Sequence, residues 1–290
     1  EDLFISRREV RVRYRFLNPS ADTVTTTVAF PMPDIEVAEG DANIVVPKED
    51  DANFLDFRTR VNGAPVRARV EQKVTAKGVE RTGLLRDWGV PLNPYLRATG
   101  AALDRLSPER KAQALKEGFA EREEFDAGKG WESHLAPRWK LATTWAWEQS
   151  FPPGETIIEH AYTPSVGVSA GTMLGSPGWR KQESVAEMLK FYCLDDDILA
   201  AVERKRRAAR TEYAPLMEER ISYVLKTGAN WAKPIRAFRL VIDKGRADNL
   251  ISLCAPGIRK ISATQFEWRR ENFQPDSDLN ILILKKAGTD

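Results

Sequence analysis

Residues 143–163, TTWAWEQSFPPGETIIEHAYT, contain two runs of alternating apolar residues that meet at a Pro-Pro-Gly corner. Side chains of a strand point alternately to its two faces, so each run predicts a β-strand with one aromatic face. If the two strands form a hairpin, Trp147 lies opposite His160 and Trp145 lies opposite Tyr162. Aromatic cross-strand pairs of this kind contribute roughly 0.2–1 kcal/mol each. The stretch therefore predicts a β-hairpin held by two aromatic pairs.

These aromatic side chains have two interpretations. On an exposed surface, Trp145, Trp147, His160 and Tyr162 are candidate ligand contacts, because aromatic rings stack on sugars and other flat apolar groups. In a core, they only fill the interior. Trp179 is a further candidate, since it ends the glycine- and serine-rich segment SVGVSAGTMLGSPGW. That segment lacks the spacing of a phosphate-binding loop, so a set of tight turns is the alternative.

The hairpin register also sets Glu148 opposite Glu159 on the reverse face. Paired carboxylates are the machinery of glycoside hydrolysis, so these two residues are the catalytic candidates of a hydrolase hypothesis. The alternative is two solvated carboxylates, or carboxylates paired with arginine or lysine from a neighbouring strand. The sequence has two histidines, His134 and His160, and lacks a nucleophile elbow, a zinc motif, a Walker loop and a dinucleotide fingerprint. We therefore expect no metal and no cofactor, and favour a protein that is not an enzyme.

The beginning of the chain also has strand character. In residues 10–18, VRVRYRFLN, apolar side chains alternate with three arginines, so one face is a core face and the other is a row of guanidinium groups. Residues 23–30, TVTTTVAF, follow a set of turn formers and predict a second hairpin, with Phe16 opposite Val24. The arginine face is either an anion-binding surface or a solvated face whose like charges keep sheets apart.

Alternating strands at both ends of the chain predict a mainly β fold, made of two β-sandwich-like antiparallel units with helical insertions. Ser107 before Pro108 marks the start of one helix, and the acidic residues 195–197 mark the start of another. The apolar run LNILIL predicts a strand at the centre of a sheet. The expected organisation is an N-terminal β unit at 1–80 and 138–170, a helical insertion at 81–137, a helical connector at 180–212 and a C-terminal β unit at 213–290.

Composition and charge narrow the function classes. The 290 residues include 44 basic and 42 acidic side chains, and this balance argues against a nucleic-acid partner. No apolar run approaches the roughly 20 residues of a transmembrane helix. The first residue is glutamate, which indicates a processed or trimmed chain, with a removed signal peptide as one ordinary cause. Cys193 and Cys254 either form one disulfide in an oxidising compartment or remain two buried thiols.

Several motifs together resemble one bacterial family. They are VRVRYRFLN, VAFPMPDI, FYCLDD, VIDKG and ENFQPDSDLNILIL, and the likeness runs over nearly the whole chain. The chain resembles the family catalogued as domain of unknown function 4424. The resemblance implies an exported, periplasmic protein of Gram-negative bacteria with a cleaved signal peptide, favours a Cys193–Cys254 disulfide, and brings no assigned activity. It also implies a further strand upstream of EDLFIS, without which the first sheet is expected to have an unpaired edge.

Three functions stay open at this point. The leading hypothesis is a periplasmic, non-enzymatic β-sandwich protein that binds a small molecule or a cell-envelope protein. The second is an assembly module that pairs through the edge of a sheet. The third is a hydrolase of an envelope polymer that uses Glu148 and Glu159.

Overall fold

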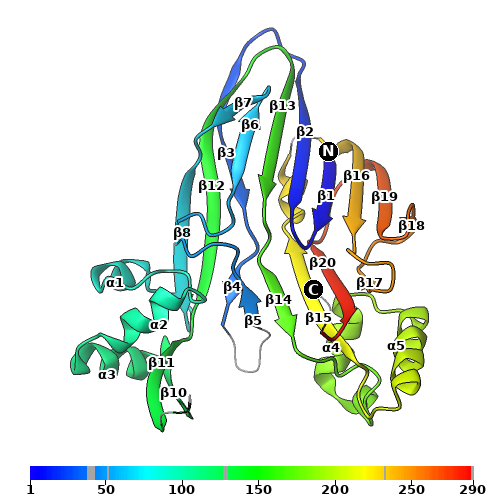
Figure 1. The fold of residues 1–290 in the computed structure, drawn as a ribbon. Coiled ribbons are helices and arrows are strands. Elements are labelled where there is room, and N and C mark those ends of the chain that lie inside the picture. Colours follow the sequence, from blue (N-terminus) through cyan, green and yellow to red (C-terminus); the bar gives the residue numbers. More distant parts are fainter. Residues whose placement is uncertain (38–42, 51, 127, 129, 232, 289–290) are drawn as a thin grey trace.

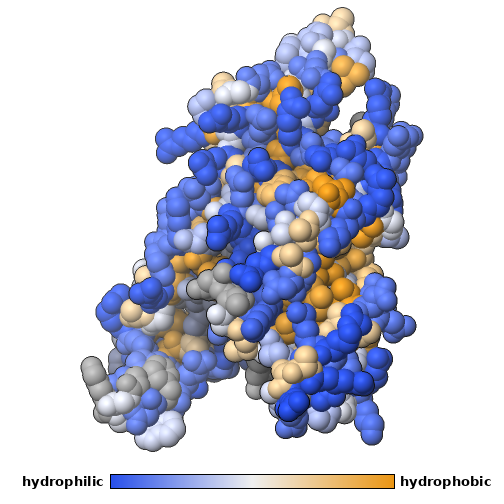
Figure 2. Space-filling model, turned by 45° about the vertical axis from the view of Figure 1, so that its right-hand side comes forward, coloured by the Kyte–Doolittle hydropathy of each residue, from blue (hydrophilic) through white to orange (hydrophobic). Residues whose placement is uncertain are grey.

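The computed structural model describes residues 1–37, 43–50, 52–126, 128, 130–231 and 233–288, and they form a mainly β protein. Figure 1 shows an elongated body of sheets with two helical regions at its lower end, α1–α3 on one side and α4–α5 on the other. In the face that Figure 2 shows, apolar surface gathers near the middle and is framed by hydrophilic side chains. The mainly β fold class predicted from the alternating sequence is confirmed.

The largest sheet, sheet A, has eight strands in the order β18-β19-β16-β1-β2-β13-β6-β7. All neighbouring strands are antiparallel except β1 and β16, which are parallel. The strands are β1 (Asp2–Ser6), β2 (Val10–Asn18), β6 (Arg58–Val61), β7 (Ala64–Val66), β13 (Gly154–Tyr162), β16 (Ile235–Asp243), β18 (Arg259–Lys260) and β19 (Gln265–Phe273).

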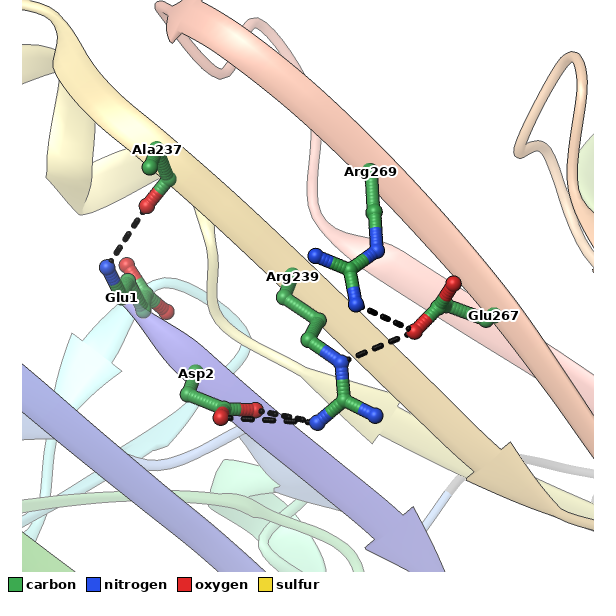
Figure 3. A network of polar contacts seen from close by, with 6 residues as sticks. All are labelled: Glu1, Asp2, Ala237, Arg239, Glu267 and Arg269. Carbon is green, nitrogen blue, oxygen red and sulfur yellow. Dashed lines mark hydrogen bonds and ion pairs between the residues drawn. The ribbon is translucent and has the colours of Figure 1, made fainter.

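The parallel pairing of β1 with β16, which we call the seam, joins the first strand of the chain to a strand of its C-terminal part (Figure 3). Arg239 on β16 donates to Asp2 on β1 at 3.2 Å and to Glu267 on β19 at 2.9 Å, and Arg269 donates to the same Glu267 at 2.8 Å. Sheet A therefore contains strands from both of the predicted β units, which share one sheet. The seam also places β1 between β2 and β16, so the first strand is not a sheet edge.

Two further sheets each have five strands. Sheet B has the order β3-β12-β8-β9, with β4 also paired to β12, and sheet C has the order β17-β20-β15-β14-β5. Sheet B comprises β3 (Val24–Pro31), β4 (Ile35–Glu36), β8 (Arg69–Ala76), β9 (Val79–Glu80) and β12 (Lys140–Phe151). Sheet C comprises β5 (Asn43–Val45), β14 (Val166–Ser169), β15 (Leu216–Tyr223), β17 (Leu250–Ser252) and β20 (Leu279–Lys286). The apolar strand β20 lies between β15 and β17, as its sequence predicts.

Both predicted hairpins are wrong, and in the same way. β2 pairs with β13 in sheet A, whereas β3 pairs with β12 in sheet B. Each pair of consecutive strands is therefore split between two sheets, and the connecting segments arch over at the top of Figure 1. Trp147 and His160 still meet, with ring centroids 5.5 Å apart, but they do so across the interior between the sheets.

The alternating pattern cannot separate an arch from a hairpin, because both turn every second side chain toward the core. The corner between β12 and β13 does carry a signal. A tight two-residue hairpin turn needs positive φ at its first central residue, whereas proline fixes φ at about −65°. Pro152 and Pro153 therefore disfavour the tight turn, and the chain crosses to the other sheet.

The main core lies between sheet A and the two smaller sheets, and it contains buried side chains from both ends of the sequence, among them Leu3, Trp145, Leu240 and Ile281. A smaller core forms where α4 and α5 pack against sheet C. It includes Leu199 and Val202 of α5 with Leu282 of β20. The chain thus has one continuous sandwich interior and one helical layer outside it.

Two of the five helices in the described residues begin at a side-chain cap. The helices are α1 (Thr82–Asp87), α2 (Arg97–Asp104), α3 (Pro108–Glu117), α4 (Glu183–Phe191) and α5 (Asp196–Ala209), with the 3₁₀ turns η1 (Trp179–Lys181) and η2 (Lys226–Asn230). Ser107 caps α3, and Asp195 caps α5 by accepting from the Ile198 N–H at 2.9 Å. The predicted helical insertion also contains an unpredicted two-stranded sheet, β10 (Ala120–Asp126) and β11 (Trp131–Pro137).

Candidate functional site

Strand β3 lies at one end of sheet B, and its outer edge pairs with no other strand of the described chain. The Met32 N–H donates to the Thr143 carbonyl at 2.9 Å. Backbone groups of an antiparallel strand alternate in direction, so the groups of Thr25, Thr27 and Ala29 point away from β12. The edge therefore presents three N–H and three C=O groups in a row.

This edge lacks the features with which proteins usually block strand pairing. Edge strands are commonly very short, charged, bulged or interrupted by proline. With eight residues, β3 is the longest strand that ends a sheet of more than two strands in the described part of the chain. Its sequence, VTTTVAFP, has no charge, although 30% of the residues of the chain are charged, and its single proline is the last residue.

A pocket of about 440 Å³ lies beside the edge. Its size falls within the range of about 300–1,000 Å³ that is usual for ligand pockets. Trp231 covers it, 37% exposed, with its ring 5.2 Å from the ring of Phe16 and 5.5 Å from that of Tyr14. β3 lines the pocket with Val28 and Phe30 on the inner face. The edge and the pocket together form what we call the edge-strand site.

His160 lies at the inner end of the edge-strand site and is 3% exposed. Its ring centroid is 4.5 Å from that of Phe30 and 5.8 Å from that of Tyr14, and its Nδ1 atom has no hydrogen-bond partner among the described residues. Burial among these rings lowers the pKa of the imidazole to about 3, because an apolar environment disfavours the charged form. The histidine is therefore neutral at physiological pH and offers one donor and one acceptor.

Of the two interpretations of the aromatic side chains at 145–162, the structure shows the core. Trp145, Trp147 and Tyr162 are buried, at 6%, 5% and 3% exposure, and they belong to the main core. Trp145 stacks on Phe57 with a centroid distance of 4.8 Å. The side chains point inward because β12 and β13 turn their aromatic faces toward each other across the sandwich. Of the predicted ligand contacts, only His160 lines the edge-strand site.

The two candidate catalytic carboxylates are not brought together. Glu148 lies on the outer face of sheet B, opposite Thr27, whereas Glu159 lies on the outer face of sheet A between Arg13 and Arg60. Packed sheets are about 10 Å apart, and both carboxylates point away from the interior. The hairpin register that paired them is therefore wrong, and the structure offers no acid–base pair at these positions.

The remaining candidates lie in the helical layer. Trp179 is half-buried in η1, where the guanidinium of Arg180 lies 4.5 Å from its ring, and it lines a separate groove beside α5. Cys193 and Cys254 form a disulfide that ties the end of α4 to the residues after β17. The disulfide favoured by the family resemblance is thus present.

Sequence reasoning missed the edge-strand site. Trp231 follows a short 3₁₀ turn and has no alternating neighbours, so no periodicity marks it as functional. A signal for β3 was available, since residues 23–33, TVTTTVAFPMP, form an uncharged stretch in a highly charged chain. That signal becomes informative only when β3 is known to lie at an edge.

Comparison with known proteins places the chain in a family. The family model described as Domain of unknown function (DUF4424) matches residues 1–282, so the chain belongs to this family. The comparisons with curated proteins and with solved structures found no match. No helix within the described residues is long and apolar enough to cross a membrane.

Proposed function

We propose that the protein is an exported, non-enzymatic binding protein that accepts an extended segment of a partner polypeptide along the outer edge of β3. The observation that carries this proposal is the long, uncharged and unpaired edge beside an aromatic pocket. In β-augmentation, backbone hydrogen bonds supply affinity and pockets for alternate side chains supply specificity. The edge-strand site has both parts.

The geometry defines the partner segment. Its backbone pairs with Thr25, Thr27 and Ala29, whose N–H and C=O groups point outward. Every second side chain then turns inward, where Phe16 and Trp231 line the pocket. An aromatic or large aliphatic side chain fits there, whereas a charged side chain would be desolvated without a partner.

The disulfide between Cys193 and Cys254 supports an oxidising compartment, because disulfides persist mainly outside the cytosol. Together with the resemblance to exported bacterial proteins, it supports the periplasm as the place of action. A partner in that compartment is a cell-envelope protein with an exposed or unpaired strand.

A proline scan at the edge tests the proposal. Thr27→Pro removes one outward N–H, and the proline ring fits an edge whose N–H faces solvent, so the pairing with β12 stays intact. Thr27→Val keeps the N–H and serves as the matched control. The probes are linear peptides selected by phage display on the wild-type protein, and their affinity is measured by isothermal titration calorimetry.

We expect Thr27→Pro to weaken the selected peptides at least tenfold, which corresponds to about 1.4 kcal/mol, and Thr27→Val to change their affinity less than twofold. Peptides N-methylated on every second residue should lose binding when the methylated residues are those whose N–H groups face β3, and should keep it when the methyl groups lie on the other residues. Equal affinity for wild type and Thr27→Pro, with both folded by circular dichroism, would overturn the proposal, as would the failure to select any peptide.

A further inference from the structure

A second surface lies on the outer face of sheet A, on the opposite side from the interior that the edge-strand site enters. The surface is a hollow of about 660 Å³ that crosses β6, β13, β2, β1 and β16. Five arginines and three carboxylates line it, and two further carboxylates, Asp56 and Glu267, pair with two of these arginines from outside the lining. We call this surface the arginine hollow. β3 does not contribute to it, so a change at the edge of β3 leaves it intact, although His160 lines both sites.

The strand registers explain why the surface is hollowed. One row across the sheet runs Arg58, Ala161, Arg11, Phe4, Val241. Neighbouring strands are about 4.8 Å apart, so the backbones of the two arginines stand roughly 10 Å apart with only a methyl group between them. The floor therefore consists of apolar side chains between the arginines, and the Arg11 guanidinium lies over one of them, 4.7 Å from the centroid of the Phe4 ring.

The next row adds two arginines and one glutamate at the same end of the hollow. It runs Arg60, Glu159, Arg13, and the Arg13 Nε atom lies 3.5 Å from the Glu159 carboxylate. No carboxylate of the described chain makes an ion pair with Arg60. Two rows of two arginines thus face each other across β13, with one glutamate between them.

Other carboxylates neutralise the rim only weakly. Glu9 lies 3.0 Å from Arg11, and Asp56 lies 3.4 Å from Arg58. Both arginines are more than half exposed, and exposed ion pairs contribute about 0–1 kcal/mol. A multivalent anion displaces such partners easily, because guanidinium groups bind phosphate oxygens in bidentate geometry.

The opposite end of the hollow is closed to anions. Arg239 is held between Asp2 and Glu267, and Arg269 bonds the same Glu267 (Figure 3). Hydrogen bonds from Arg269 and Arg239 lower the pKa of Glu267 to about 2, so this carboxylate stays charged and keeps Arg239 occupied. The apolar floor formed by Phe4 and Val241 leads up to this neutralised end. The two ends of the hollow therefore differ: one has three weakly paired arginines and Arg60, which has no ion pair within the described residues, and the other has the apolar side chains of Phe4 and Val241.

We propose that the arginine hollow binds an organic phosphate, with the phosphate group between Arg58, Arg60 and Arg11 and the organic part beside Phe4 and Val241. The four guanidinium groups on the two sides of β13 favour a multivalent anion, which accepts from several of them at once, over a single carboxylate, and the apolar side chains favour an apolar substituent over free phosphate. A dissolved phosphate ester and the phosphate of a lipid headgroup share this chemistry, so the experiment separates them.

The probe is phenyl phosphate, compared with inorganic phosphate by isothermal titration calorimetry in low salt. We expect phenyl phosphate to bind at least fivefold more tightly than inorganic phosphate. The double variant Arg58→Gln/Arg60→Gln should weaken phenyl phosphate at least tenfold. The matched control, Arg15→Gln/Arg67→Gln, removes the same two charges from exposed positions outside the hollow and should change affinity less than twofold.

Two results of the calorimetry would overturn the proposal. Equal weakening of phenyl phosphate binding in both double variants would mean that general charge attraction, not the hollow, binds the probe. The other result is the absence of measurable binding of phenyl phosphate. Co-sedimentation with phosphatidylglycerol vesicles supplies the lipid arm: binding to vesicles without binding to phenyl phosphate would replace a small-molecule site with a membrane-facing surface. None of these results depends on β3, so the two proposals fail separately.

Discussion

The buried imidazole of His160 makes the stability of the protein dependent on pH in a way that can be calculated. The residue is 3% exposed, surrounded by the rings of Phe30, Phe57 and Trp147, and burial lowers its pKa to about 3. In the unfolded chain the pKa returns to about 6.5. The perturbation is acidification from pH 7 to pH 5, applied to the wild type and to His160→Phe.

The sign follows from proton binding. Between pH 6.5 and pH 3 the unfolded chain binds a proton at this histidine and the folded chain does not, so the free energy of unfolding falls as the pH falls. With pKa values of about 3 and about 6.5, the loss between pH 7 and pH 5 is about 2 kcal/mol. Phenylalanine cannot be protonated, so His160→Phe lacks this contribution.

The assay is urea unfolding followed by tryptophan fluorescence at both pH values. The wild type should lose about 2 kcal/mol more than His160→Phe between pH 7 and pH 5. His134→Gln is the contrasting control. Hydrogen bonds to Asp104 and Glu132 raise the pKa of His134, so its contribution is present at acid pH and lost as the pH rises through its folded pKa. An equal loss of unfolding free energy between pH 7 and pH 5 for the wild type and His160→Phe would refute the reasoning. It would mean that the folded interior accepts the charged imidazole.

Two further predictions concern the helical layer. Replacing Cys193 and Cys254 by serine should lower the free energy of unfolding by about 4 kcal/mol, the chain-entropy value for a link between residues 61 apart, and urea unfolding that shows less than 1 kcal/mol of loss would contradict this. Asp195→Ala should cost about 1 kcal/mol, because its carboxylate accepts from the Ile198 N–H at 2.9 Å, whereas Asp197→Ala, two residues further along and without that bond, should cost a few tenths of a kcal/mol in the same assay.

Local alternation predicted individual strands well. In β2, Val10, Val12 and Tyr14 are buried while the arginines between them are exposed, because a strand that covers a core must place every second residue inside. The strand β20 is buried on both faces because α5 packs on the side of sheet C that faces away from sheet A. In both cases the pattern of apolar residues within the strand predicts which of its faces are buried.

Contacts between distant segments were not predictable in this way. The strand β10, AEREEFD, is highly charged and has low intrinsic preference for a strand. It is stabilised by pairing with β11, which Asp104 of α2 anchors through the Leu135 N–H at 2.9 Å and through His134 at 2.7 Å. No window of the sequence that contains β10 alone shows these partners.

The failed hairpin prediction and the edge-strand site have one origin. A hairpin between β2 and β3 would have paired the backbone of β3 on the side that is now open. The arch instead gives β2 to sheet A, where β1 and β13 occupy both of its edges, and leaves β3 with β12 alone. The same arch separates the inner faces of β2 and β3 by the width of the sandwich, which opens the pocket between Phe16 and Val28 beside Trp231. A substitution that converted the arch into a hairpin would therefore pair the open edge of β3 and remove the pocket at the same time. Peptide binding at β3 should be lost whenever β2 moves from sheet A to sheet B.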